Sequence, residues 1–224
     1  MAISFLDLET FKSTPMTTEP FNYIVIPRFV RTAALPLINA DYPDISTSGS
    51  FPLGQLSCGP AFRQFIDELE STEFRVAFEE KFKIDLAARP TTVTVRGWCA
   101  SKDGKIHTDS VNKIITVLIY LNSSWDVPGG RLRLLRRAND LDDLITEIPP
   151  IEGTMLAFKR AENSWHGHKP FAGARRVIQF NWVTSEKDQR IAMLRHHASA
   201  ALKRVTAAFL PAHPTPVRES RAKN

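Results

Sequence analysis

Residues 114–121 read IITVLIYL, a run of β-branched and aromatic residues that is typical of a β-strand. Successive side chains of a strand point to opposite faces of the sheet. One face of this strand is wholly aliphatic, with Ile115, Val117, Ile119 and Leu121. The other face carries Thr116, Leu118 and Tyr120. Tyr120 then either points its hydroxyl into an interior cavity or bonds it to a backbone group.

A second stretch, residues 175–183, reads RRVIQFNWV and divides in the same way. The face that belongs against a hydrophobic layer carries Arg176, Ile178, Phe180 and Trp182. The opposite face carries Arg175, Val177, Gln179 and Asn181. Because this second face is polar enough to line a wet cavity, Arg175 is a better candidate than Arg176 to bind a carboxylate there through its two-pronged guanidinium.

Three further segments have strand-like composition after Pro90, namely residues 91–98, 131–135 and 154–158. Glycine and proline separate these segments, for example at residues 128–130 and 149–150. Several short strands with turn signals between them indicate a mainly β fold of the sandwich or jelly-roll type.

The first 90 residues are expected to cover this core. Residues 21–26 read as a strand that ends at Pro27, since proline cannot donate to a sheet. Residues 45–60 are rich in serine, glycine and proline and are interpreted as a loop. Apolar residues from 62 to 82 recur at helical spacing, which predicts one or two amphipathic helices on one face of the sheet.

After the last strand, residues 185–209 return to a helical pattern with Ser185 as the N-cap. Residues 211–224 carry too little apolar surface to fold and are predicted to be a disordered basic tail. We therefore expect one domain over residues 1–210, with a cover of about 1–90, a core of about 91–184 and a C-terminal helix of about 185–209.

Bulk composition excludes several classes of protein. The net charge is +5, but from Arg190 onward five arginines and two lysines face one acid, so the basic excess is a tail on a nearly neutral body. Nucleic-acid binding is therefore not favoured. No apolar run reaches the length of a membrane span, and residues 1–11 do not form a secretory signal. The two cysteines, Cys58 and Cys99, suit a reducing compartment, so we expect a cytoplasmic protein.

A metal-ligating pattern precedes the strand at 114–121. His107 and Asp109 are two residues apart and share one face if this segment is extended. Two imidazoles and one carboxylate form the open site of non-haem Fe(II) oxygenases. The residues alone leave the third ligand open, with His166, His168 and the pair His196-His197 as candidates. A zinc hydrolase that uses both His166 and His168 is the competing interpretation.

Taken together, these residues resemble the Fe(II)- and 2-oxoglutarate-dependent dioxygenases, in their prolyl-4-hydroxylase-like branch. The resemblance covers about residues 91–183. It rests on the order and spacing of the HTD motif at 107–109, IITVLIYLN at 114–122, Trp125, Gly129-Gly130, Gly153, His166 and Arg175.

The resemblance implies a double-stranded β-helix, the cupin-like form of a jelly roll, flanked by α-helices. It implies His107, Asp109 and His166 as the iron ligands and as the catalytic centre. Arg175, nine residues after His166, would grip the distal carboxylate of 2-oxoglutarate, with Tyr120 beside it. His168 departs from the family, which often has a small apolar residue there.

The implied activity is hydroxylation of a peptidyl side chain or a small molecule, coupled to decarboxylation of 2-oxoglutarate to succinate and CO2. Iron, 2-oxoglutarate and O2 would be required, with ascorbate as a candidate reductant. A metal-binding β-sandwich without catalysis, acting as an interaction or sensor module, is the alternative. The primary substrate and the oligomeric state stay open. Residues 45–60 and 98–105 are candidate lids over the site.

Overall fold

The computed structural model describes residues 4–195. Its strands are β1 (Tyr23–Ile26), β2 (Phe51–Pro52), β3 (Thr91–Cys99), β4 (Lys113–Tyr120), β5 (Leu132–Leu135), β6 (Leu144–Ile148), β7 (Met155–Lys159), β8 (His166–Gly167) and β9 (Gly173–Val183). Its helices are α1 (Leu8–Ser13), α2 (Leu35–Ala40), the 3-10 turn η1 (Leu53–Gln55), α3 (Pro60–Leu69) and α4 (Thr72–Phe82). Every strand predicted from the sequence is present, and β9 begins earlier than expected, at Gly173.

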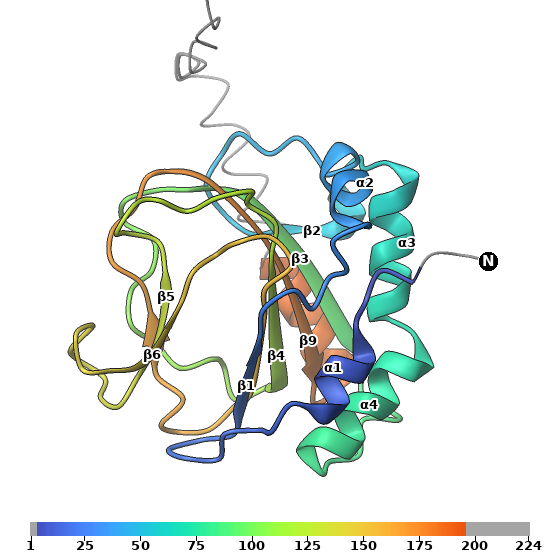
Figure 1. The fold of residues 1–224 in the computed structure, drawn as a ribbon. Coiled ribbons are helices and arrows are strands. Elements are labelled where there is room, and N and C mark those ends of the chain that lie inside the picture. The colour runs from blue at the N-terminus through green and yellow to red at the C-terminus, as the bar shows by residue number, and fades with distance from the viewer. Residues whose placement is uncertain (1–3, 196–224) are drawn as a thin grey trace, which may run out of the picture.

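The strands form two antiparallel sheets. The larger has the order β1-β7-β4-β9-β3-β2, and the smaller has the order β6-β5-β8. In Figure 1 the smaller sheet lies opposite one face of the larger one, and the helices lie on the other face. Strands β1 and β2 come from the first 90 residues, so the expected cover contributes both edges of the larger sheet.

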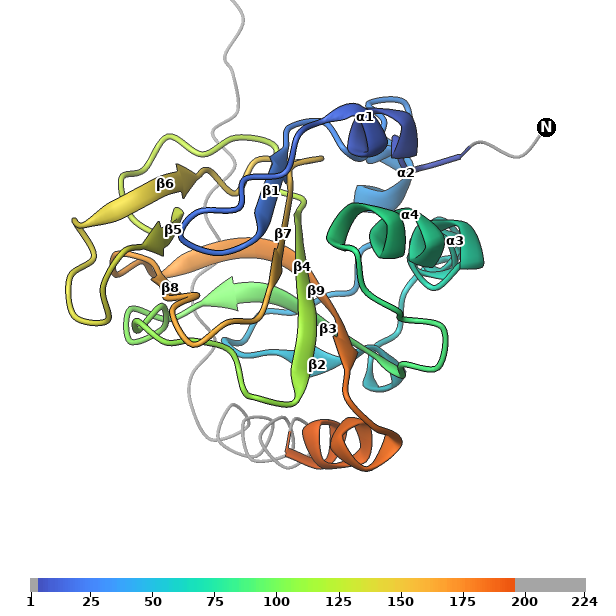
Figure 2. The same ribbon diagram turned by 90° about the horizontal axis from the view of Figure 1, so that it is seen from below.

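The helices bury the outer face of the larger sheet, as the aromatic periodicity predicted. Phe74 and Phe78 of α4 contact Trp182 of β9, with ring centroids 5.7 and 5.0 Å apart. Ile115, Val117 and Ile119 of β4 join the same core. Figure 2 shows α3 and α4 side by side against this sheet. Aromatic rings that pack this closely are among the largest single contributions to a core.

The inner face of the larger sheet has a second, smaller apolar cluster. Tyr120 of β4 and Val177 of β9 pack there against Leu132 and Leu134 of β5. The alternation predicted for β4 and β9 is therefore confirmed on both faces. One face contributes to the helix-covered core, and the other lies between the two sheets.

Some elements were not predicted. Residues 45–60 are not a loop throughout, because β2 pairs with β3 and η1 follows it. Strand β6 is at the edge of its sheet and only half-buried, so its sequence, LITEI, lacks a clear apolar face. Strand β8 has only two residues and is held by pairing with β5. No local sequence pattern predicts this pairing.

A helix follows β9 over residues 186–195, and the hydroxyl of Ser185 accepts a hydrogen bond from the backbone N–H of Asp188 at 3.2 Å. The predicted N-cap is thus confirmed. The rest of the predicted helix, His196-His197 and the tail at 211–224 lie outside the described residues.

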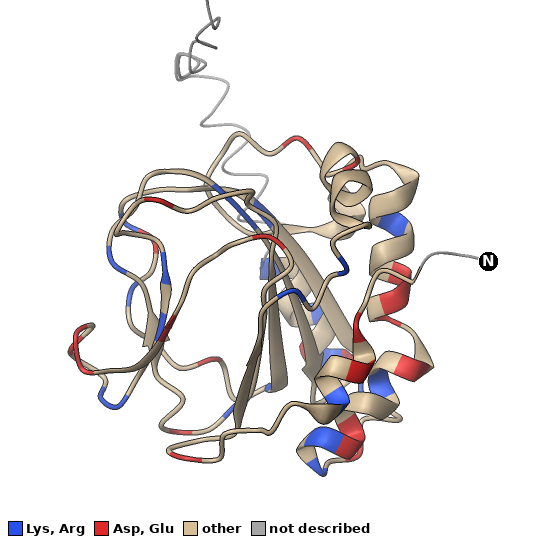
Figure 3. Cartoon of the chain, viewed as in Figure 1, with Lys and Arg blue, Asp and Glu red and all other residues tan. Residues whose placement is uncertain are grey.

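Within 4–195, no helix combines the length and apolar character needed to cross a bilayer. Acidic and basic residues lie next to one another along α4 (Figure 3), where Arg75 pairs with Glu79.

Candidate metal centre

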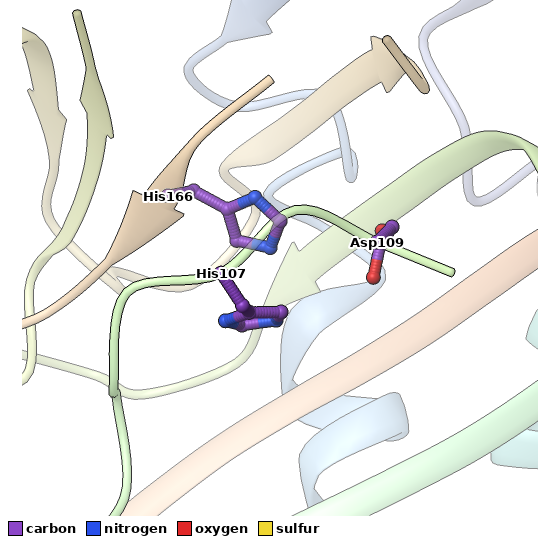
Figure 4. Close-up of side chains that lie close together, drawn as sticks. All are labelled: His107, Asp109 and His166. Atoms are coloured by element: carbon purple, nitrogen blue, oxygen red, sulfur yellow. The ribbon is translucent and has the colours of Figure 1, made fainter. Parts of the chain in front are cut away.

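The backbone brings His107 and His166 together. The N–H of His107 donates to the carbonyl of His166 at 3.0 Å, and the N–H of His166 donates to the carbonyl of His107 at 2.9 Å. This antiparallel bridge puts the two imidazole rings 4.3 Å apart. Asp109 follows two residues after His107, and one ligand atom from each of the three side chains lies within 4.8 Å of the others (Figure 4). The three side chains could therefore hold one metal ion.

Both histidines are oriented by backbone carbonyls. Nδ1 of His107 lies 2.8 Å from the carbonyl oxygen of Lys105, and Nδ1 of His166 lies 3.0 Å from that of Ser164. Because a carbonyl oxygen only accepts, these contacts assign the proton to Nδ1 in each ring. Nε2 then carries the free lone pair that a metal needs, the arrangement common around metal-binding histidines.

Asp109 is held by two donors. The ammonium of Lys113 lies 2.7 Å from Oδ1, and the hydroxyl of Thr116 donates to Oδ2. Burial of Asp109 raises its pKa, but Lys113 and His166, together with these hydrogen bonds, more than compensate and lower the pKa to about 2. The carboxyl group is therefore ionised near neutral pH, as a metal ligand must be.

His166 is kept neutral by its surroundings. It is buried, and this burial is the main cause that lowers its pKa to about 4, against the opposing effect of Asp109. A neutral imidazole is the form that binds metals. His107 is exposed, whereas Asp109 and His166 are buried. The three candidate ligands therefore have one member exposed to solvent and two buried.

Arg175 is a buried cation without an acidic partner among residues 4–195. It is 5% exposed, and its Nε donates to the carbonyl of Gly130 at 2.9 Å. Gly130 has φ of +73°, and a Cβ there would lie 2.6 Å from the Trp125 ring, so this close approach requires glycine. Because burying an unpaired charge is costly, Arg175 is suited to an anionic ligand.

Tyr120 lies next to this arginine. The guanidinium carbon of Arg175 is 5.3 Å from the centre of the Tyr120 ring. The Tyr120 hydroxyl is buried and has no hydrogen bond of normal geometry with any described residue. Burial raises the pKa of Tyr120, and Arg175 partly offsets this effect. The backbone bond considered for this hydroxyl is absent, so an acceptor oxygen of a ligand would satisfy it.

A cavity of about 250 Å³ lies between the two sheets. Its wall includes four of the predicted site residues, namely His107, Asp109, His166 and Arg175. Its wall also includes Ser50, Arg96, Gly104, Lys113, Thr116, Leu118, Leu132, Gly167, His168, Val177 and Gln179. Tyr120 is fully buried and is not part of this wall. The three candidate metal ligands and Arg175 thus face the same cavity. A dicarboxylate bound in this cavity could contact the metal with one carboxylate and Arg175 with the other.

His168 lies outside the metal-ligating group. Its Nδ1 is 2.9 Å from the carbonyl oxygen of Lys169, and its Nε2 is 3.9 Å from Sγ of Cys99. The ring also packs on Gly104, where a Cβ would lie 2.3 Å from Nδ1. The competing zinc site, which needs His166 and His168 on one ion, is therefore not supported by the structure.

Several residues of the site were not singled out from the sequence. Lys113 and Thr116 hold Asp109, and Asn181 continues the network by donating to the Thr92 hydroxyl at 3.0 Å. Strand alternation already placed Thr116 and Asn181 on the polar faces of their strands. No comparable signal was available for Lys113, whose role depends on the path of the chain between Asp109 and β4.

Residues 98–184 match the sequence profile of the 2OG-Fe(II) oxygenase superfamily. This part of the chain is a 2OG-Fe(II) oxygenase core. The match agrees with the resemblance found in the motif and its spacing, and it identifies the enzyme class as a dioxygenase that uses ferrous iron and 2-oxoglutarate. No curated protein has a significant sequence match to the chain.

Solved structures share the oxygenase fold. A Pseudomonas putida prolyl-4-hydroxylase is 14% identical, with a TM-score of 0.54 over 79% of this chain and 97% of that one. A viral collagen prolyl hydroxylase of Paramecium Bursaria Chlorella virus-1, solved with 2OG, is 18% identical, with a TM-score of 0.51 over 72% and 94%. A 2OG-Fe(II) oxygenase family oxidoreductase of Burkholderia pseudomallei is 12% identical, with a TM-score of 0.51 over 82% and 93%. The predicted double-stranded β-helix is thereby confirmed.

Proposed function

We propose that His107, Asp109 and His166 bind the ferrous ion of this oxygenase and that Arg175, with Tyr120, binds the distal carboxylate of 2-oxoglutarate. The observation that carries this assignment is the buried Arg175, which has no acidic partner among residues 4–195 and faces the same cavity as the three ligating side chains. An anionic cosubstrate that also reaches the metal would satisfy both features at once.

Iron and 2-oxoglutarate, when bound, supply oxidative decarboxylation to succinate and CO2 and the hydroxylation of a C–H bond. The chain itself supplies position and charge. The carbonyls of Lys105 and Ser164 aim the two imidazoles, and Thr116 and Lys113 fix the carboxylate of Asp109. Arg175 gives the cosubstrate one orientation through its rigid guanidinium.

The substrate we propose is a peptidyl side chain or a small molecule, entering from the exposed side of His107. The prolyl hydroxylase neighbours act on proline, which is compatible with a peptide.

We also propose that residues 1–210 act as one domain. Cys58 and Cys99 are both free, which suits the reducing cytoplasm.

The direct test is anaerobic binding of Fe(II) and 2-oxoglutarate by the purified protein, followed by succinate release in air. We expect one iron per chain in the wild type and none in a His166→Ala variant. His168→Gln is the matched control, because His168 lies outside the ligating group and should leave the iron content unchanged. A His166→Ala protein that still binds iron and turns over 2-oxoglutarate normally would overturn the assignment.

The same assay separates the alternative functions. A non-catalytic sensor or interaction module would bind metal but release no succinate across a panel of peptides and small molecules. A hydrolase would work with zinc and ignore 2-oxoglutarate. We expect turnover to require ferrous iron and to be lost in Asp109→Ala.

A further inference from the structure

A second arginine, Arg96 of β3, faces the same cavity as Arg175. Side chains alternate along β3, so Val93 and Val95 join the helix-covered core while Arg96 lies on the inner face. Arg96 is paired across the sheet with Val177 of β9, two residues beyond Arg175. The two guanidinium groups therefore extend from neighbouring strands into one space.

The bonds that Arg96 makes do not use all of its donors. Its Nε donates to the Ser50 hydroxyl at 2.8 Å, and its Nη1 lies 3.7 Å from a carboxylate oxygen of Asp103. Its Nη2 has no partner among the described residues. Asp103 is a loose partner, because the same oxygen also accepts the backbone N–H of Ala100 at 3.0 Å. The fork of Arg96 can thus still donate toward the cavity.

The charges around the cavity favour a further anion. Burial is the main cause that lowers the pKa of Arg96. Asp103 raises this pKa, and the positive charge of Arg175 lowers it further, because the two arginines repel each other. A ferrous ion would bring two positive charges, and Lys113, Arg96 and Arg175 bring one each. Asp109, Asp103 and both carboxylates of 2-oxoglutarate bring four negative charges. One positive charge remains when metal and cosubstrate are both counted.

We propose that Arg96 is a second anion-binding residue of this cavity and that it binds a carboxylate which Arg175 does not hold. The carboxylate belongs either to the metal-proximal end of 2-oxoglutarate or to the primary substrate. The remaining positive charge favours the primary substrate, which makes that substrate an anionic molecule. The inference that the primary substrate is anionic rests on the proposed function, whereas the anion site at Arg96 does not.

The first experiment uses metal-free protein and inorganic sulfate as the probe, measured by titration calorimetry at low ionic strength. We expect the wild type to bind sulfate at two sites, and Arg96→Gln and Arg175→Gln each to lose one. Arg136→Gln is the matched control, because Arg136 is an exposed arginine on the hairpin after β5 and its loss changes the net charge equally. An Arg96→Gln protein that binds as much sulfate as the wild type would overturn the proposal.

The second experiment uses protein loaded with Mn(II), which binds without turnover, and identifies the source of the carboxylate. If 2-oxoglutarate binds at least about tenfold more weakly to Arg96→Gln, Arg96 binds the cosubstrate. If the affinity for 2-oxoglutarate is unchanged and sulfate still binds the wild-type ternary complex but not the variant, Arg96 binds the primary substrate. If neither quantity changes, the proposal is wrong.

A purely structural role for Arg96 predicts another pattern. Loss of its bonds to Ser50 and Asp103 would lower the melting temperature without changing the number of sulfate sites. Arg96→Lys keeps the charge but loses the fork, so we expect it to retain the sulfate site with weaker affinity. If the protein fails to bind iron but the sulfate results hold, the proposed function is wrong and the anion site stands.

Discussion

The two faces of the six-stranded sheet differ in how many polar and charged side chains they carry. The outer face is buried under α3 and α4 by aromatic and aliphatic side chains that need no polar partner. The inner face carries Arg96, Arg175 and Tyr120, and the cavity beside it is also lined by the histidines and the aspartate of the candidate metal site. Among residues 4–195, Arg175 has no acidic partner and the buried Tyr120 hydroxyl has no hydrogen bond of normal geometry. The comparison indicates that stability is concentrated on one face and ligand binding on the other.

The largest effect is expected from Asp109→Asn, which removes the only acidic member of the ligating group. We expect no measurable iron binding or succinate release, because the amide supplies no negative charge to a cation. The far-ultraviolet circular dichroism should stay that of the wild type. A variant that loses its fold together with iron binding would show that the inner face also carries stability.

Phe78→Ala tests the outer face. Phe78 is fully buried and contacts Phe11, Phe74, Phe82 and Trp182. Truncating a core phenylalanine costs about 3–5 kcal/mol of unfolding free energy. Denaturant unfolding should show this loss, whereas Gln179→Ala on the inner face should cost less than about 1 kcal/mol. Equal losses would break the comparison between the two faces.

The free energy of unfolding of the chelator-treated protein should decrease as the pH is lowered. His166 has its pKa lowered from 6.5 to about 4, so the unfolded chain binds a proton between these values that the folded chain does not. Stability due to a neutral His166 is therefore lost as pH falls from about 6.5 to 4, by on the order of 3 kcal/mol. Asp109, with its pKa lowered from 3.8 to about 2, adds a further loss below pH 4.

This dependence is measured by urea unfolding at a series of pH values. His166→Gln should flatten the curve between pH 6.5 and 4, since glutamine does not titrate. His168, whose pKa burial also lowers to about 4, contributes in the same window. An unchanged curve in His166→Gln would mean that this imidazole does not control the acid sensitivity.

The smallest expected effect comes from Thr116→Val, which removes the hydroxyl that donates to Asp109 but keeps the shape of the side chain. Loss of a group that positions a metal ligand typically weakens metal binding by about 10–100-fold. Thr92→Val lies further along the same network, through Asn181, and should have a smaller effect. Competition with a chelator measures both, and equal effects would argue against a specific role for Thr116.

Much of the fold could be predicted because its signals are local. The positions of α3 and α4 followed from aromatic spacing, and β4 and β9 followed from alternation. The signals failed where pairing across the sheets, rather than composition, makes the strand. Strand β8 has only two residues, and β2 is an edge strand within a segment rich in serine, glycine and proline.

The candidate site divides in the same way. His107 and Asp109 could be found because a period of two places both on one face, and Arg175 because its face of β9 is polar. The pairing of Asp109 with Lys113 and the approach of Arg96 to Arg175 depend on loop paths and strand neighbours. The spacing of residues along the sequence did not predict these contacts.

By itself, the sequence determined the alternation of the central strands, the helical cover and the HTD motif, since side-chain direction in a strand or helix repeats at a fixed period. The residues alone left His166 and His168 open, and only the tertiary structure showed which of the two lies beside His107 and Asp109. The backbone bridge from His107 to His166 puts one imidazole against Asp109, whereas His168 packs on Gly104 and Cys99. The physical reason is that register between distant strands, not spacing along the chain, fixes which side chains meet.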